Sequence, residues 1–204
     1  IWGGEAVGIV NPINPMLEEK VLEDILLKAK SKLLVTSLPS SNNYIWPKIE
    51  SILDTLPDLE TIIFVNSDYS KRTLDYSLPE DLSKKVIDWH QSVSLQPKHL
   101  NFEIRAFEGN EIASIFHTGG TTGRPKLAQH THKNIVSDGW MLGNAFGHVK
   151  DKVFFCGLPL FHVNAVIATG IMPFSKGATV VLGPPAGYRS SGILENFWHI
   201  VEQY

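Results

Sequence analysis

A short segment rich in glycine and threonine, residues 116–126, carries the groups of this sequence that are best suited to bind phosphate. It reads Phe-His-Thr-Gly-Gly-Thr-Thr-Gly-Arg-Pro-Lys and follows an apolar run that begins at Ile112. Because glycine has no Cβ, the backbone N–H groups of such a segment can turn toward a bound anion. The threonine hydroxyls add further donors, and Lys126 adds a mobile positive charge. The segment therefore predicts a loop that holds the phosphates of a nucleotide.

Two common phosphate-binding motifs do not fit this segment. A Walker A loop requires lysine directly after its last glycine and then Ser or Thr. Here two residues separate Gly123 from Lys126, and Leu127 follows the lysine. The dinucleotide fingerprint requires Gly-x-Gly-x-x-Gly, whereas Gly119 and Gly120 are adjacent. Both interpretations are excluded.

The segment instead resembles the phosphate loop of the adenylate-forming (AMP-binding) superfamily, written [Tyr/Phe]-Thr-Ser-Gly-Thr-Thr-Gly-x-Pro-Lys. His117 departs from the usual aromatic residue, and Gly119 departs from the usual serine. The positions that match are Thr118, Gly120, Thr121, Thr122, Gly123, Pro125 and Lys126. The resemblance implies that ATP phosphates are held by Thr118, Gly119, Gly120, Thr121, Thr122, Gly123 and Lys126. It further implies that Thr122 meets Mg²⁺ and that Lys126 stabilises the pyrophosphate.

Three other segments resemble the same superfamily in the expected order. Residues 3–15 are similar to an early family segment, and residues 126–134 to a strand that runs into Thr-His-Lys-Asn at a helix start. Thr131 is a suitable N-cap for that helix. Gly-Leu-Pro-Leu-Phe161-His162-Val is similar to the family's Leu-Pro-Leu-Phe-His segment. The resemblance implies that Phe161 and His162 border the acyl pocket, at the carboxyl end of a strand where open α/β sheets bind ligands.

The resemblance implies an α/β fold with three layers, in which largely parallel sheets are flanked by helices. We expect the chain to be part of the N-terminal AMP-binding domain of a larger enzyme, with the C-terminal domain absent. Residues 1–110 would form a first α/β portion with a polar excursion at 66–110, and residues 111–204 the phosphate-loop portion. We do not find the later family segments Tyr-Gly-x-Thr-Glu and Thr-Gly-Asp, or the catalytic lysine. We therefore assign no catalytic residue within this fragment, and we expect the fragment to be inactive alone.

The implied parent is an ATP-dependent acid–thiol ligase of the acyl-CoA synthetase or fatty-acid–CoA ligase type. Its substrates would be a small-molecule carboxylic acid of any chain length, ATP with Mg²⁺, and CoA, and it would form an acyl-adenylate and then a thioester. Two alternatives stay open: an aryl-acid or amino-acid adenylating domain, and a non-catalytic nucleotide-binding domain. The sequence does not indicate which acid is used, and it does not indicate an oligomeric state.

The composition agrees with a globular chain of this kind. Of its residues 43% are hydrophobic and 19% charged, and the net charge of −3 argues against a nucleic-acid partner. The single cysteine, Cys156, lies in an apolar run, which predicts a buried, inert thiol and a reducing compartment, the cytoplasm. We find no signal peptide, and no apolar run approaches the roughly 20 residues that a membrane span needs.

Hydrophobic periodicity and turn residues predict alternating strands and helices, as expected for a parallel sheet. The predicted strands cover 7–10, 32–37, 60–65, 112–116, 126–129, 152–156 and 178–182. The predicted helices cover 16–30, 44–56, 79–92, 132–147, 162–174 and 190–204.

Several polar and aromatic residues allow a purely structural interpretation beside a functional one. His130 and His132 are spaced to share one face of a strand, but without acidic or cysteine neighbours a structural role is favoured over a metal site. His117 fits either the core or a pocket wall. A backbone N–H of His132 at the first turn of its helix would be free for a cap or an anion. Trp140, Phe174 and Trp198 are expected in the core or at an interface.

Overall fold

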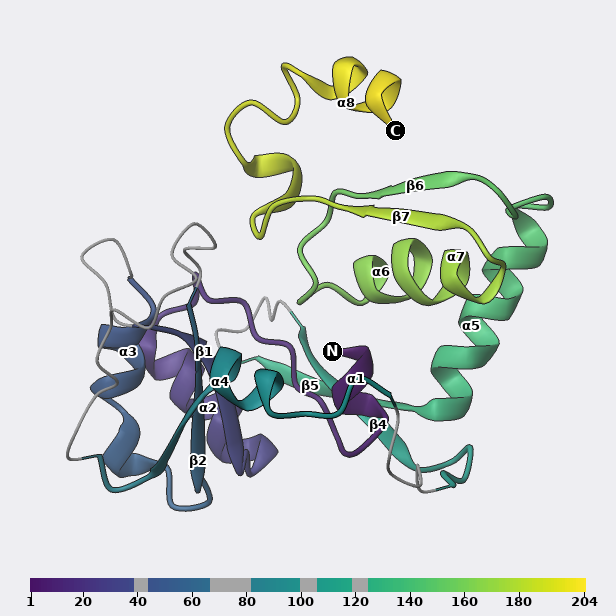
Figure 1. The fold of residues 1–204 in the computed structure, drawn as a ribbon. Coiled ribbons are helices and arrows are strands. Elements are labelled where there is room, and N and C mark those ends of the chain that lie inside the picture. Colours follow the sequence, from purple (N-terminus) through teal and green to yellow (C-terminus); the bar gives the residue numbers. More distant parts are fainter. Residues whose placement is uncertain (39–43, 67–81, 100–105, 119–124) are drawn as a thin grey trace. The chain divides into compact units, whose positions relative to one another are not determined.

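The computed structural model describes residues 1–38, 44–66, 82–99, 106–118 and 125–204. Strands alternate with helices along the chain, and the strands of two of its sheets run parallel (Figure 1). This confirms the predicted α/β fold with parallel sheets flanked by helices. The chain divides into two compact units, which are described separately. We call residues 14–99 with 125–127 the β1–β3 unit, and residues 1–13, 106–118 and 128–204 the β4–β7 unit.

The β1–β3 unit is built on a parallel sheet of order β1-β2-β3. Its strands are β1 (Leu33–Ser37), β2 (Thr61–Val65) and β3 (Lys85–Asp88). Leu33 pairs with Thr61, which pairs with Lys85 on the other side, so β2 is the central strand. The sheet is accompanied by α2 (Glu19–Ala29), α3 (Trp46–Glu50), the short 3₁₀ helix η1 (Leu53–Thr55) and α4 (Trp89–Ser94) (Figure 1).

The core of this unit lies on one face of β2. Ile62 and Phe64 are two residues apart in the strand and therefore share one face, and both are fully buried, at 0% exposure. The ring of Trp46 packs edge-on against Phe64 with centroids 4.8 Å apart. Helix α2 contributes a buried stripe at helical spacing, formed by Leu22, Ile25 and Leu26. Each such side chain stabilises the fold by about 1.5–3 kcal/mol relative to an exposed one, so the core fixes the register of the sheet.

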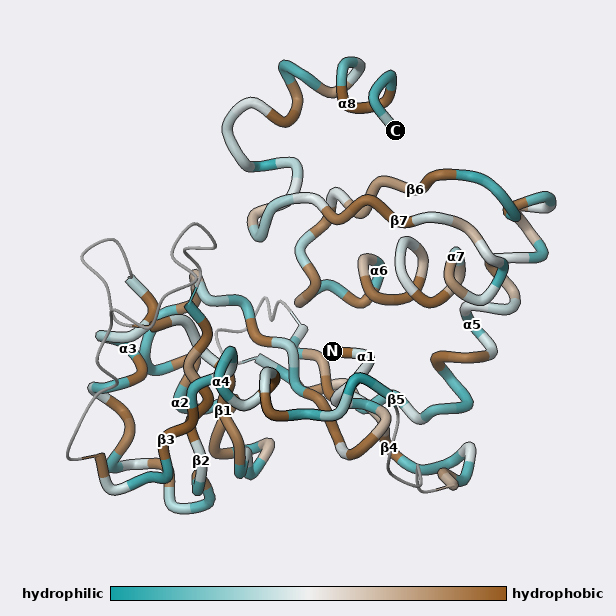
Figure 2. The backbone as a smooth tube through the Cα atoms, in the orientation of Figure 1, coloured by the Kyte–Doolittle hydropathy of each residue, from teal (hydrophilic) through white to brown (hydrophobic). Residues whose placement is uncertain are grey.

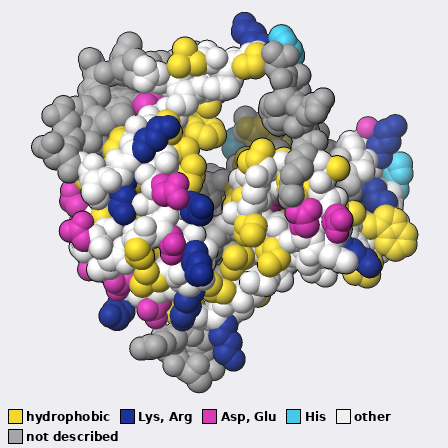
Figure 3. Space-filling view, turned by 90° about the horizontal axis from the view of Figure 1, so that it is seen from below, with side chains coloured by type: hydrophobic (Ala, Val, Ile, Leu, Met, Phe, Trp, Pro, Cys, Tyr) yellow, Lys and Arg dark blue, Asp and Glu magenta, His cyan; other side chains and the backbone are white. Residues whose placement is uncertain are grey.

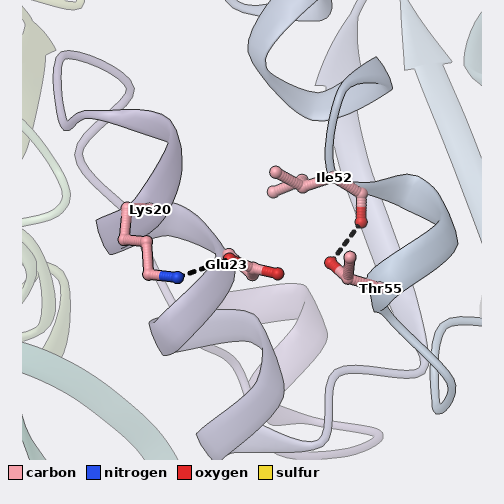
Figure 4. A network of polar contacts seen from close by, with 4 residues as sticks. All are labelled: Lys20, Glu23, Ile52 and Thr55. Atoms are coloured by element: carbon pink, nitrogen blue, oxygen red, sulfur yellow. Dashed lines mark hydrogen bonds and ion pairs between the residues drawn. The ribbon is translucent and has the colours of Figure 1, made fainter.

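The outer contacts of α2 and η1 add little to this stability (Figure 4). Lys20 and Glu23 form an ion pair of 3.9 Å in which the Lys20 side chain is 82% exposed. An exposed pair of this kind contributes about 0–1 kcal/mol. The Thr55 hydroxyl donates to the Ile52 carbonyl oxygen over 2.8 Å and thereby closes η1. The unit therefore depends on its buried stripe and not on its surface ion pairs.

The predicted helix over 79–92 is wrong. Residues 85–88 form β3 instead, and α4 begins only at Trp89. Val86 and Ile87 are β-branched, and they pair with Ile62 and Ile63 of the central strand. Asp88 then ends the strand, because its buried carboxylate accepts a hydrogen bond of 2.6 Å from the N–H of Gln91 and caps α4. Tertiary pairing with β2 overrides the helical spacing of the sequence.

The β4–β7 unit begins with α1 (Trp2–Glu5) and contains β4 (Ile112–Thr118) and, from residue 128 on, its sheet partner β5 (Lys126–Thr131). The predicted strand over 7–10 is reduced to a bridge at Val10. The N–H of Val10 donates to the Ala113 carbonyl, and its own carbonyl accepts from the N–H of Ile115. The other predicted strands of both units are confirmed to within one or two residues of their ends.

The second sheet of this unit pairs β6 (Val153–Cys156) with β7 (Thr179–Leu182) in parallel. Between these strands the chain forms one helical segment: α6 (Val163–Val166), a π turn η2 (Ile167–Ile171) and α7 (Met172–Ser175). This segment lies beneath the two strands in Figure 1 and also packs against α5 (His132–Ala145). Figure 2 shows that hydrophobic residues dominate the segment and both strands.

A small residue allows the close packing of α5 on this segment. A Cβ at Gly139 would lie only 3.1 Å from Cγ2 of Ile171, and Gly139 is buried. The neighbouring core is formed by Ala113, Ile135 and Ile167. The chain ends with the 3₁₀ turn η3 (Gly187–Arg189) and α8 (Phe197–Gln203), which is shorter than the predicted helix over 190–204.

Three large aromatic residues lie at the surface and not in the core. Trp140, Phe174 and Trp198 are 63%, 48% and 75% exposed, so of the two expected positions the core does not apply and an interface position stays a prediction. Elsewhere on the surface, basic and acidic side chains are interspersed on the face drawn in Figure 3. Among the described residues, no helix has the length and apolar character needed to cross a membrane.

Candidate functional site

The expected phosphate loop is bounded by two residues that the structure describes. Thr118 is the last residue of β4, and Lys126 is the first residue of β5; both side chains are exposed. Gly119, Gly120, Thr121, Thr122 and Gly123 lie outside the described residues. The placement of the loop directly after a strand is confirmed, and the phosphate and Mg²⁺ contacts stay predictions.

The start of α5 is formed as the sequence predicts. The Thr131 hydroxyl accepts a hydrogen bond of 3.1 Å from the N–H of Asn134, and the Asn134 side chain accepts one of 3.0 Å from the N–H of Thr131. This reciprocal capping box fixes where β5 ends and α5 begins. The expectation of a free N–H at His132 is wrong, because that group donates to the Glu111 carbonyl over 3.0 Å.

Three rings meet at the ends of β4 and β6, and we call His117, Phe161 and His162 the ring cluster. His117 is the next-to-last residue of β4, and the other two lie in the turn that joins β6 to α6. The His117 and Phe161 rings are stacked, with centroids 6.2 Å apart and planes inclined by 25°. The Phe161 and His162 rings are 4.7 Å apart. The structure therefore brings together a residue of the phosphate-loop strand and both residues that the sequence assigns to the acyl pocket.

The two histidines of the ring cluster differ in their surroundings. His117 is half-buried, whereas His162 is exposed. Burial lowers the pKa of His117, and the nearby charge of His162 lowers it further. At neutral pH His117 is therefore a neutral imidazole. Its half-buried position beside Phe161 favours a wall of the candidate site over the interior of the core.

The turn that carries Phe161 is fixed by a segment that the sequence analysis missed. The N–H of Tyr188 donates to the Gly157 carbonyl over 2.7 Å, and the Tyr188 ring lies directly over Gly157. Gly187 allows this approach, because its φ of +60° is readily adopted only without a side chain. The same ring packs edge-on against Phe155 of β6 at 5.6 Å. The run Gly-Pro-Pro-Ala-Gly-Tyr, residues 183–188, is a turn signal that could have pointed to this contact.

His130 and His132 have structural surroundings. The His130 ring lies 5.3 Å from Phe116, and the His132 ring lies 4.6 Å from Phe107. Within the described part of the chain, no group of three or more His, Cys, Asp or Glu side chains is arranged to hold a metal ion. These contacts support the structural interpretation.

Near these histidines, burial raises the pKa of the Glu5 carboxyl group from its usual value of 4.5. The neighbouring Ser114, the chain's N-terminal amino group, His132 and His130 oppose that shift. The buried state that the sequence predicts for Cys156 is confirmed.

Comparison with known proteins identifies the family of this chain. The sequence pattern of the family described as AMP-binding enzyme matches residues 5–204. The chain belongs to this family. The AMP-binding chain is 30% identical over 209 residues to the marinolic acid–CoA ligase of Pseudoalteromonas sp. (strain SANK 73390), which covers 100% of this chain and 30% of that ligase. It is 28% identical to the oxalate–CoA ligase of Saccharomyces cerevisiae, over 91% of this chain and 34% of that ligase.

Solved structures agree with the fold. The anthranilate CoA ligase AuaEII, determined in complex with anthranoyl-AMP, superimposes on this chain with a TM-score of 0.75 and 22% sequence identity. The match covers 97% of this chain and 34% of that enzyme. The AMP-binding chain thus spans about a third of the length of these relatives.

Proposed function

We propose that this AMP-binding chain supplies the ATP phosphate loop and part of the acyl pocket of an ATP-dependent carboxylic acid–CoA ligase. The family match over residues 5–204 carries the proposal, and the relatives named above are acid–CoA ligases. In such a reaction the substrate carboxylate attacks the α-phosphate of ATP, which gives an acyl-adenylate and releases pyrophosphate. The CoA thiol then attacks the acyl carbon, which gives the thioester and releases AMP.

The first step requires that a carboxylate approach a polyanion, and the phosphate-loop residues are suited to reduce that repulsion. We assign positive charge to Lys126 at the start of β5 and a hydroxyl donor to Thr118 at the end of β4; both side chains are exposed. We assign backbone donors to Gly119, Gly120 and Gly123 and hydroxyl donors to Thr121 and Thr122. Such donors stabilise the charge that develops on the leaving pyrophosphate. Mg²⁺, for which Thr122 is the proposed ligand, would add further positive charge when bound.

The ring cluster supplies the proposed acyl side of the site. Phe161 offers a half-buried apolar surface, and His162 offers an exposed imidazole that can donate a hydrogen bond. Both follow β6 at its carboxyl end, the position at which parallel α/β sheets bind ligands. We assign them to the wall where the acyl group meets the nucleotide. The proposed substrate class is carboxylic acids.

The chain alone is proposed to be inactive. It spans about a third of the length of its relatives, and its sequence holds neither the Tyr-Gly-x-Thr-Glu segment nor the Thr-Gly-Asp segment of the family. Exchange of labelled pyrophosphate into ATP by the 204-residue chain, with Mg²⁺ and a carboxylic acid present, should stay at the background rate. Robust exchange would contradict this part of the proposal.

The full-length protein should pass two assays in sequence. Pyrophosphate exchange with ATP, Mg²⁺ and a panel of aliphatic, aromatic and amino acids is expected to depend on one class of acid. Loss of the free CoA thiol should then follow with the same acid. Acid-dependent exchange without thiol loss would indicate an aryl-acid or amino-acid adenylating domain that uses another acceptor. ATP binding without any exchange would indicate a non-catalytic nucleotide-binding domain and overturn the proposal.

A further inference from the structure

We propose that His117 is a positioning residue of the acyl site, whose ring holds Phe161 in place by stacking on it. This inference rests on the proposed function, because it assigns the Phe161 wall to substrate. Its starting observation is a feature of this chain: His117 stands where the family pattern has an aromatic residue.

The geometry shows what a histidine at this position contacts. The His117 ring stacks on Phe161 at 6.2 Å with an inclination of 25°, which is close to the offset arrangement that aromatic pairs prefer. Phe161 also lies next to His162, with ring centroids 4.7 Å apart and planes inclined by 46°. Phe161 thus neighbours two imidazoles, one from β4 and one from its own turn. His117 directly precedes Thr118, the last residue of β4.

The charge state of His117 matters because a second imidazole lies nearby. Among the described residues, burial and the charge of His162 are what act on the pKa of His117, and both lower it. His117 is the sole ionisable side chain of β4, and α6 carries none. On the paired strand β5, His130 packs against Phe116, whose side chain points to the opposite face of β4 from that of His117. Among the described residues, His162 is the charged neighbour that adds to the larger effect of burial on the pKa of His117.

The direction of the pH effect follows from these causes. A histidine whose pKa is lower in the folded state contributes stability that is complete above its unfolded value of about 6.5. That contribution is lost as the pH falls through the lowered folded value. Protonation would place a positive charge on a half-buried ring and so disfavour its stacked position on Phe161. Acid should thus loosen the ring cluster.

The decisive experiment follows the histidine ring signals of the 204-residue chain by NMR as the pH is lowered. His117→Phe identifies the His117 signal by its loss, and His162→Asn removes the neighbouring charge. We expect His117 to titrate below the ordinary histidine value. In His162→Asn its pKa should rise and yet stay below that value, since burial is the larger cause. Titration at or above the ordinary value, or no change in His162→Asn, would overturn the proposal.

A kinetic comparison in the full-length enzyme separates positioning from a merely structural role. His117→Ala removes the stacked ring and should raise KM for the carboxylic acid by about 2- to 12-fold, the worth of one aromatic contact, while KM for ATP stays unchanged. His117→Phe keeps a ring and should restore KM, and it should move the acid limb of the pH profile to lower pH. An equal rise in both KM values, or no rescue by His117→Phe, would refute positioning. If the wild-type enzyme shows no acid-dependent exchange, the proposed function fails, whereas the NMR result stands by itself.

Discussion

Gly157 is a position near the candidate site at which one added methyl group would meet a packed aromatic ring. It follows β6 directly and starts the turn that leads to Phe161 and His162. A Cβ built on Gly157 would overlap Cζ, Cε1 and Cε2 of the Tyr188 ring, closer than real atoms approach. The ring has little room to retreat, because its own backbone N–H is tied to the Gly157 carbonyl at 2.7 Å and its other side packs on Phe155.

Gly157→Ala should therefore destabilise the protein by the cost of overpacking. Inserting a methyl group into a packed contact costs about 1–3 kcal/mol. For a chain of this length, each kcal/mol lowers Tm by about 2–4 °C, so we expect a decrease of roughly 2–12 °C. Thermal unfolding followed by circular dichroism measures this decrease. The shift should also displace the turn and change the NMR signals of the ring cluster, His117 included.

A double-mutant cycle with Tyr188→Leu tests whether the Tyr188 ring is the cause. Leucine lacks the three atoms that the new Cβ would meet, so Gly157→Ala should cost at least about 0.5 kcal/mol less in the Tyr188→Leu background. Gly3→Ala is the matched control, because a Cβ at Gly3 meets nothing within 4 Å and alanine favours its helix. The reasoning is refuted if Gly157→Ala leaves Tm within about 1 °C of the control, a shift below the range estimated above, or if its cost is the same with and without the ring.

Three further changes test other parts of the structure. In the full-length enzyme, Lys126→Ala should slow adenylation more than thioester formation, with Lys133→Ala, an exposed lysine of α5, as the control; equal slowing of both steps would argue against a phosphate contact. Burial raises the pKa of Glu5, so its ionisation costs stability as the pH rises from the unfolded value through the raised folded one. Glu5→Gln should abolish that dependence, and Tm curves with the same pH slope would contradict it. Thr131→Ala removes the cap of α5 and should cost about 0.5–2 kcal/mol in denaturant unfolding, whereas an unchanged midpoint would show the capping box to be dispensable.

The sequence predicted best where local physics and tertiary contacts agree. The α5 cap follows from Thr131 and Asn134 alone, since the capping box is a local exchange of hydrogen bonds. The strand β4 follows equally from its apolar run. The prediction of a helix over 79–92 was wrong because pairing with β2 decides the conformation of Val86 and Ile87. The strand β2 lies more than twenty residues away from them in sequence. The sequence left Trp140 between the core and an interface for a related reason: helical spacing shows which residues share a face, but not which face is buried, and the structure exposes this one.

The candidate site shows the same division between local and distant information. Motif spacing located Phe161 and His162, because each side chain belongs to one short segment with a fixed order. It could not pair them with His117, since that contact joins strands β4 and β6, which are adjacent neither in sequence nor in one sheet. His117 was noticed as a departure from the family pattern, and the structure supplies its partners. A residue that replaces the usual aromatic and still stacks on Phe161 keeps the packing of that position and adds a proton-binding group. On the proposal above, the wall keeps its shape at neutral pH and loosens in acid, so His117→Phe and His117→Ala should both lose the acid sensitivity of the wild type, and only His117→Phe should keep the stacked ring and with it the KM for the carboxylic acid.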